Sequence, residues 1–143
     1  MLDGYLKRGA DTATTLTMGW YIDRGNCNTD PPKPDDNSIS DIYGRDGEID
    51  PDLNLGLPQT YPMRTLTYVL FRPARSNADA QAAYTALVKW ARSVRGSELY
   101  DHDGLCTYQR VTFSGAKRLD NDSAFQRVRL TFKAWPWRKD GEL

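Results

Sequence analysis

The chain has 143 residues, with 19 Lys and Arg against 19 Asp and Glu, so its formal net charge at pH 7 is zero. A chain of this length predicts one domain, residues 1–143, that buries enough surface to fold without a disulfide or a metal. Zero net charge disfavours a dedicated nucleic-acid binder, because such proteins usually carry an excess of basic residues that contact phosphates.

The two cysteines, Cys27 and Cys106, are far apart in the sequence, and no C-x-x-C or Cys/His grouping accompanies them. This spacing disfavours a structural zinc site and favours two free thiols over a disulfide. The sequence shows no apolar signal-peptide core at its start and no run of about 18 apolar residues. We therefore expect a soluble protein made without a secretion signal.

The first patterned segment, Thr15–Ile22, alternates apolar and more polar residues, which predicts a half-buried strand. From Asp23 to Pro62 no periodicity persists, and Pro, Asp and Asn are frequent. Loops longer than about 12–15 residues in a compact domain are usually functional or disordered. We expect residues 23–62 to form an extended arm or loop.

Arg64–Phe71 reads as a second strand that ends near Pro73. A helix follows, with Ser76 or Asn77 as its N-cap and Gly96 as the residue after its C-cap. Its apolar stripe has helical spacing and consists of Ala80, Ala83, Tyr84, Leu87, Val88, Ala91 and Val94. Trp90 lies off this stripe, which places it at the edge of the core or in a subunit contact.

Short strands complete the chain. Glu98–Tyr100 and Cys106–Phe113 flank an Asp-Gly turn, residues 114–123 read as a loop or a wide hairpin, and Ala124–Trp135 is the last strand. One face of that strand is apolar, and the other is solvated or faces a polar partner. The predicted fold class is mainly β with one α-helix (α+β): an antiparallel β-sandwich or barrel flanked by a single helix.

His102, the only histidine, lies between Asp101 and Asp103. One interpretation is a metal site or a general base oriented by a carboxylate. The alternative, which we favour, is a polar hairpin turn in which Asp and Gly serve the backbone geometry. Cys106 as a nucleophile would need a nearby base, and His102 lies only four positions back across the turn.

The segment Tyr43–Asp50 concentrates glycine and charge. Asp46, Glu48 and Asp50 alternate as in a calcium loop, but the glycine follows the first acid directly and the expected distal Glu is absent. Arg45 between these acids suits a hydrogen-bonded contact with a neighbouring subunit. A solvated charged loop is the alternative.

Four stretches, taken in order, resemble the N-terminal domain of siphophage distal tail proteins, which are related to phage tail-tube proteins. They are Asp46–Asp50 with Tyr61 and Arg64–Leu66; the helix end Leu87–Trp90; Leu99–Asp101 with Tyr108–Val111; and Val128–Phe132 with Trp135–Trp137. The resemblance covers roughly residues 12 to 138.

The resemblance implies a non-enzymatic structural protein of the virion, assembled in the host cytoplasm. It implies a homo-oligomeric ring, commonly a hexamer, that links the tail tube, the tape-measure protein and the tail-tip or baseplate proteins. No cofactor, metal, membrane or specific nucleic-acid contact is implied, and DNA passes through the lumen. Many members have a second, C-terminal domain, whereas this sequence ends at Leu143, so a major tail-tube subunit or another ring protein of this fold stays open.

The proposed subunit-interface residues lie in the arm, at the start of the second strand and on the helix. They are Tyr43, Arg45, Asp46, Glu48, Ile49, Asp50, Leu53, Tyr61, Arg64 and Trp90. Two other classes of protein remain open: a small enzyme that uses His102, and a monomeric β-sandwich binding module.

Overall fold

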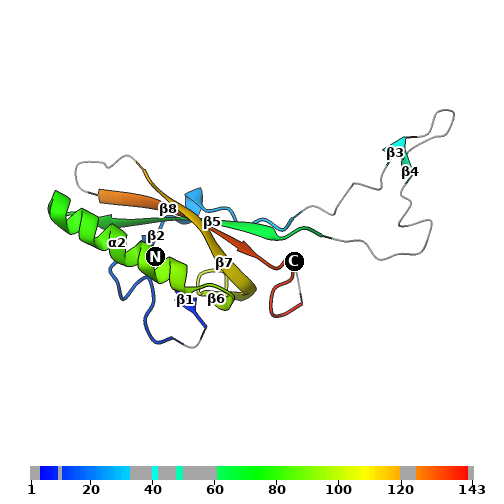
Figure 1. Cartoon of the computed structure of the whole chain (residues 1–143), viewed down its shortest axis with the longest axis horizontal. Coiled ribbons are helices and arrows are strands. Elements are labelled where there is room, and N and C mark those ends of the chain that lie inside the picture. Colours follow the sequence, from blue (N-terminus) through cyan, green and yellow to red (C-terminus); the bar gives the residue numbers. More distant parts are fainter. Residues whose placement is uncertain are drawn as a thin grey trace.

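The computed structural model describes residues 4–9, 11–32, 40–41, 48–49, 61–119 and 125–141. Figure 1 shows strands with a single long helix, which confirms the predicted fold class. In chain order the elements are β1 (Leu6–Arg8), β2 (Tyr21–Ile22), the 3-10 helix η1 (Arg24–Asn26), β3 (Ser40–Asp41), β4 (Glu48–Ile49), β5 (Arg64–Pro73), α2 (Asn77–Ser93), β6 (Ser97–Asp101), β7 (Cys106–Arg118) and β8 (Phe125–Ala134).

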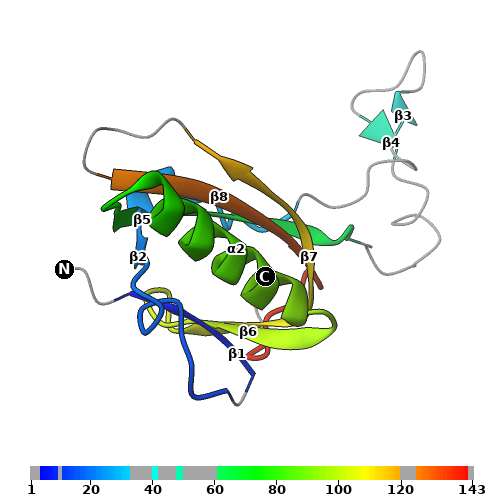
Figure 2. The same cartoon turned by 60° about the vertical axis from the view of Figure 1, so that its left-hand side comes forward.

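Six strands form one antiparallel sheet in the order β1-β6-β7-β8-β5-β2. The long strand β7 pairs with β6 through its first half and with β8 through its second half. In Figure 2, β5 and β8 lie on one side of α2, and β1 and β6 lie on the other. The sheet therefore curls, and its two halves face each other around one core.

The core draws on both halves of the curled sheet and on the helix. Leu6 and Leu99 from the β1–β6 half, and Leu66 and Leu130 from the β5–β8 half, are all fully buried and belong to one cluster. Burying an aliphatic side chain of this size contributes about 1.5–3 kcal/mol. Packing of this kind explains why the two halves stay closed on each other.

The helix begins and ends close to the predicted positions. The Ser76 hydroxyl caps it by accepting a hydrogen bond from the backbone N–H of Asp79 at 3.1 Å. Val94 is the C-cap. Gly96, with a φ of 72°, is therefore the second residue after the C-cap and not the first, as predicted. The buried Gln126 side chain donates to the Ala80 carbonyl at 2.8 Å and ties the helix to β8.

The prediction of a strand over Thr15–Ile22 was wrong for all but its last two residues. Residues 15–19 form turns, and Gly19 adopts a φ of 91°. The hydroxyls of Thr14 and Thr17 bond to each other's backbone, with N–O distances of 3.2 and 2.9 Å, which competes with a strand ladder. The alternation of apolar and polar residues still predicted which side chain is buried at Trp20, which is 1% exposed.

Of the two readings of residues 114–123, the structure fits the wide hairpin rather than the loop, because β7 continues to Arg118 and pairs with β8. A register shift between Phe113 and Gly115 marks a bulge there, and such bulges bend a strand. The alternation of β8 is confirmed: Gln126, Val128, Leu130, Phe132 and Ala134 are all buried. In the β6–β7 turn, the residue with positive φ is Leu105, at 51°, rather than a glycine.

The first residues of the predicted arm lie on the sheet. The backbone N–H of Asp23 donates to the Val69 carbonyl at 2.8 Å, and Asn28 exchanges two hydrogen bonds of 2.9 Å with Thr67. Further along, β3 and β4 pair with each other, and Figures 1 and 2 show this pair apart from the six-stranded sheet. Within the described part of the chain, no helix has the length and apolarity needed to cross a bilayer.

Candidate assembly site

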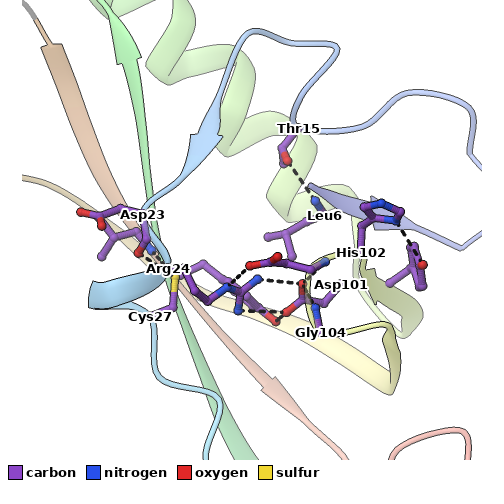
Figure 3. Close-up of polar contacts among 12 residues, drawn as sticks. Leu6, Thr15, Asp23, Arg24, Cys27, Asp101, His102 and Gly104 are labelled. Carbon is purple, nitrogen blue, oxygen red and sulfur yellow. Dashed lines mark hydrogen bonds and ion pairs between the residues drawn. The ribbon is translucent and has the colours of Figure 1, made fainter. Parts of the chain in front are cut away.

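The guanidinium of Arg24 bridges two distant parts of the fold. From η1 it reaches the end of β6, where Nη2 lies 2.9 Å from Asp101 Oδ1 and Nη1 lies 3.3 Å from Asp101 Oδ2, and the following turn, where Nε lies 2.6 Å from Asp103 Oδ2 (Figure 3). Asp101 is 1% exposed. This forked contact is the geometry in which arginine binds carboxylates most strongly. We call Arg24, Asp101, Asp103 and Tyr68 the latch.

Asp101 receives further donors beside Arg24. The Tyr68 hydroxyl donates to Oδ2 at 3.0 Å, and the backbone N–H groups of Asp103 and Gly104 donate to Oδ1 at 3.1 and 3.2 Å. Both carboxylate oxygens are thus satisfied, as a buried charge requires. The latch is a buried ion pair that joins η1 to β6 and to the turn after it.

The latch shifts the pKa of its members. Burial lowers the pKa of Arg24, but the hydrogen bonds and charges of Asp101 and Asp103 outweigh this effect and raise it above its ordinary value. Burial, followed by the negative charge of Asp101, raises the pKa of Tyr68 well above 10.0. Both groups therefore keep their protons over a wide range of pH.

The ring of His102 packs against its aromatic neighbours. It stacks on Tyr5 with ring centroids 4.4 Å apart and an interplanar angle of 7°, and its Nδ1 lies 3.3 Å from the Tyr100 hydroxyl. In the described part of the chain, no three His, Cys, Asp or Glu side chains gather as metal ligands. The contacts of His102 are those of a packed hairpin residue.

Both cysteines are thiols, Cys106 buried and Cys27 half-buried. Burial raises the pKa of Cys27, and the backbone N–H of Val69 lies 3.5 Å from its Sγ. Burial and then a hydrogen bond with Cys106 raise the pKa of Tyr108 to about 12. A raised thiol pKa lowers the thiolate fraction and hence the reactivity of Cys27.

Three of the predicted interface residues have described side chains. Tyr61 packs edge-on against Trp137 at a centroid distance of 5.6 Å. Trp90 is partly buried against the core. Arg64 is 2% exposed, donates to the Thr29 carbonyl at 2.6 Å and lies 4.9 Å from the Tyr108 ring centroid, so it clamps its own chain together.

The other predicted interface residues lie largely beyond the described structure. Tyr43, Arg45, Asp46, Asp50 and Leu53 are outside the described residues. Glu48 and Ile49 form β4, where Glu48 is the register partner of Asp41 and Ile49 that of Ser40. Their interface role stays a prediction.

Sequence reasoning missed part of one surface on the outer side of β7 and β8. We call Lys117, Arg127, Arg129 and Lys133 the basic face. Arg127, Arg129 and Lys133 alternate with buried residues along β8, and Lys117 is the register partner of Arg129. The alternation along β8 indicated the polar face, whereas the stretch with Lys117 was predicted only as a loop or a wide hairpin, without a register.

Comparisons with known proteins bear on the fold. No protein-family model matches the sequence, and no curated protein matches it. A crystal structure of the SPP1 Dit protein, described as a paradigm of the hub adsorption apparatus in phages infecting Gram-positive bacteria, matches with a TM-score of 0.67 and 16% identity. The fold is similar to that of a phage distal tail protein. The match covers 96% of this chain and 50% of that protein, so this chain spans half its length.

Proposed function

We propose that this chain is a structural subunit of a phage tail, which forms a ring at the distal end of the tail tube. The observation that carries the proposal is the likeness to SPP1 Dit at a TM-score of 0.67 over 96% of the chain. The order of the sequence motifs from Asp46 to Trp137 supports the same family independently. The ring would connect the tube, the tape-measure protein and the tail-tip or baseplate proteins in the virion.

The geometry suits a subunit that serves as a rigid body. The latch joins η1 to the β6–β7 turn, and the Arg64 clamp joins the start of β5 to Thr29 and, at 3.3 Å, to the Pro136 carbonyl. A head-to-tail contact between such bodies closes into a ring when the rotation between neighbours is fixed. The arm residues Tyr43, Ile49 and Leu53 would anchor one neighbour, as the sequence predicts.

Sedimentation velocity and native mass spectrometry of the purified chain test this function. We expect a closed oligomer, with six copies as the leading stoichiometry. Deleting Tyr43–Asp50 should leave the folded body intact and abolish the oligomer. A strict monomer at high concentration would contradict the ring, and unfolding of the deletion variant would show that the segment is part of the folded body.

A major tail-tube subunit is the second candidate, because the sequence motifs resemble a family whose fold is related to that of tail-tube proteins. Electron microscopy of assembled particles separates the two candidates: a single terminal ring fits a distal tail protein, and a stack of rings fits a tube protein. For both candidates we propose a non-enzymatic role, since the aspartates beside His102 are engaged by Arg24.

A further inference from the structure

The second half of β7, residues 112–118, pairs with a strand on one side only. It pairs with β8, whereas β6 pairs with β7 only as far as Val111. No backbone group outside β8 that the structure describes bonds to the backbone of residues 112–118. In Figure 2 this half of β7 runs along the outside of the sheet. The N–H and C=O groups of such an edge are a template for a further strand.

The pairing with β8 shows which backbone groups of β7 point outward. The backbone N–H of Leu119 donates to the Arg127 carbonyl at 3.0 Å. Positions that bond to the partner strand alternate along an antiparallel pair, so Lys117, two residues back in an unbroken register, also bonds to β8. The backbone groups of Ala116 and Arg118 therefore point away from β8, toward the open edge.

A hollow on one flank of α2 lies beside this edge. Its volume is about 410 Å³, and it is lined by Tyr84, Thr85, Val88, Lys89 and Arg92. Arg118 joins the edge to this flank, because its guanidinium lies 5.2 Å from the centroid of the Tyr84 ring and its Nη1 donates to Gln81 Oε1 at 2.9 Å. The register partners of Ala116 and Arg118 in β8 are buried, so this face of the hairpin is the one that α2 covers. A strand added to the edge would place every second side chain over the hollow.

We propose that the β7 edge and the hollow bind an extended peptide segment of another protein by antiparallel strand addition. The segment would carry apolar residues at alternate positions, which enter the hollow, with acidic residues between them, which face the exposed Lys117. Lys89 and Arg92, both exposed, add positive charge at the rim of the hollow. The inference goes beyond the proposed ring and does not rest on it, since the edge and the hollow belong to a single chain.

The sheet edges of a second copy fit this site less well than an extended segment does. The outer strands of the described sheet are β1, with three residues, and β2, with two. Edges this short make few hydrogen bonds with residues 112–118, whereas a free segment can pair along the whole edge. The main-chain bonds supply affinity in strand addition, so the longer pairing is favoured.

The first test measures binding of a fluorescein-labelled peptide of alternating valine and glutamate to the full chain by fluorescence anisotropy. We expect saturable binding to the wild type and its loss in Ala116→Pro, because proline removes an N–H that points away from β8 and leaves the β8 ladder intact. Lys117→Pro removes a donor to β8 and should instead destabilise the fold. Peptide binding that Ala116→Pro leaves unchanged would overturn the proposal, as would the absence of binding to the wild type.

The second test leaves the protein unchanged and alters the backbone of the peptide. In antiparallel pairing the residues opposite Ala116 and Arg118 share their face, so the valine N–H groups bond to β7 and the glutamate N–H groups point away. N-methylation of the valines should weaken binding about tenfold or more, because several hydrogen bonds are lost. N-methylation of the glutamates should have little effect. Equal effects of the two peptides would contradict strand addition.

The third test examines the hollow. Val88→Glu should weaken binding of the valine–glutamate peptide about tenfold or more, because a carboxylate replaces an apolar side chain that the valines would cover. Ala86→Glu places the same charge on an exposed position of the helix outside the hollow and should bind as the wild type does. Equal weakening by the two variants would count against the hollow as part of the site.

Sedimentation velocity of the wild type and of Ala116→Pro separates this site from the ring. An oligomer that is retained in Ala116→Pro while peptide binding is lost supports the proposal. An oligomer that is lost in Ala116→Pro, from a wild type that does not bind the peptide, would assign the edge to a second copy and overturn it. A monomeric wild type that binds the peptide contradicts the ring and supports the peptide site.

Discussion

The Tyr68 hydroxyl donates to Asp101 Oδ2 at 3.0 Å, although β7 and β8 lie between β5 and β6 in the order of the sheet. The contact is possible because the sheet curls and brings these strands together across the core. Arg24 joins the same carboxylate from the far side of β5. One buried aspartate thus holds three segments of the chain together.

Replacing Arg24 with Met should lower the free energy of unfolding by about 2–4 kcal/mol, because it leaves the buried Asp101 without its cation. Urea denaturation monitored by circular dichroism measures this change. The double variant Arg24→Met with Asp101→Asn should lower the free energy of unfolding by less than the sum of the two single changes. Lys139→Met, which breaks an exposed pair with Glu98, should change stability by less than about 1 kcal/mol. If Arg24→Met and Lys139→Met lowered the free energy of unfolding equally, the result would contradict a buried latch.

Tyr68→Phe should flatten the alkaline part of the stability profile. The folded pKa of Tyr68 lies well above 10.0, so above that pH the unfolded chain loses a proton that the folded chain keeps. Its stabilising effect is fully present below pH 10 and falls by about 1.4 kcal/mol per pH unit above it. Urea midpoints measured from pH 8 to 11.5 reveal the slope.

Tyr108→Phe provides the comparison for this titration. Its folded pKa is about 12, so Tyr108 contributes a slope of the same sign that ends near that pH. Each variant should therefore retain the other tyrosine's slope. An alkaline slope that Tyr68→Phe leaves unchanged would argue against the raised pKa.

Ser76→Ala should destabilise the protein by about 1 kcal/mol, because it removes the side chain that caps the N–H of Asp79. Thermal unfolding measures the change. Ser76→Asp should retain the cap and add a favourable charge at the helix N-terminus. A loss in Ser76→Asp equal to that in Ser76→Ala would show that the hydroxyl serves another role.

His102→Ala should lower stability by about 0.5–1.5 kcal/mol through loss of the stack on Tyr5, and assembly should be unaffected. His102→Phe retains the stack and should recover most of the loss. Elemental analysis of the purified wild type checks for bound metal. Metal that copurifies with the wild type and is lost in both variants would revive the metal interpretation.

Strong periodicity made the helix, β5 and β8 predictable, because burial of one face repeats at 3.6 or 2 residues along them. The same reasoning gave a wrong strand at residues 15–19. The segment forms turns, because the hydroxyls of Thr14 and Thr17 accept hydrogen bonds from each other's backbone N–H groups. The sequence left a loop and a wide hairpin open for Gly115 and the neighbouring basic residues, and a bulge accommodates them within β7.

The latch could not be read from the sequence, because Arg24 and Asp101 are separated by 77 positions and only the curl of the sheet unites them. The same limit applies to the basic face, which needs the β7–β8 register to bring Lys117 opposite Arg129. Arg64 was predicted to belong to an interface from its motif, whereas its burial depends on Tyr108 and Pro136, which come from other strands and loops.

The pair of hydrogen bonds between Asn28 and Thr67 closes the chain between them into a loop whose two ends are held by the sheet. The entropy of closing such a loop grows only with the logarithm of its length, so doubling the length costs about 0.6 kcal/mol. The body should therefore tolerate large insertions between Pro32 and Tyr61. A reporter domain inserted there should leave the body folded, even where it blocks assembly through the arm.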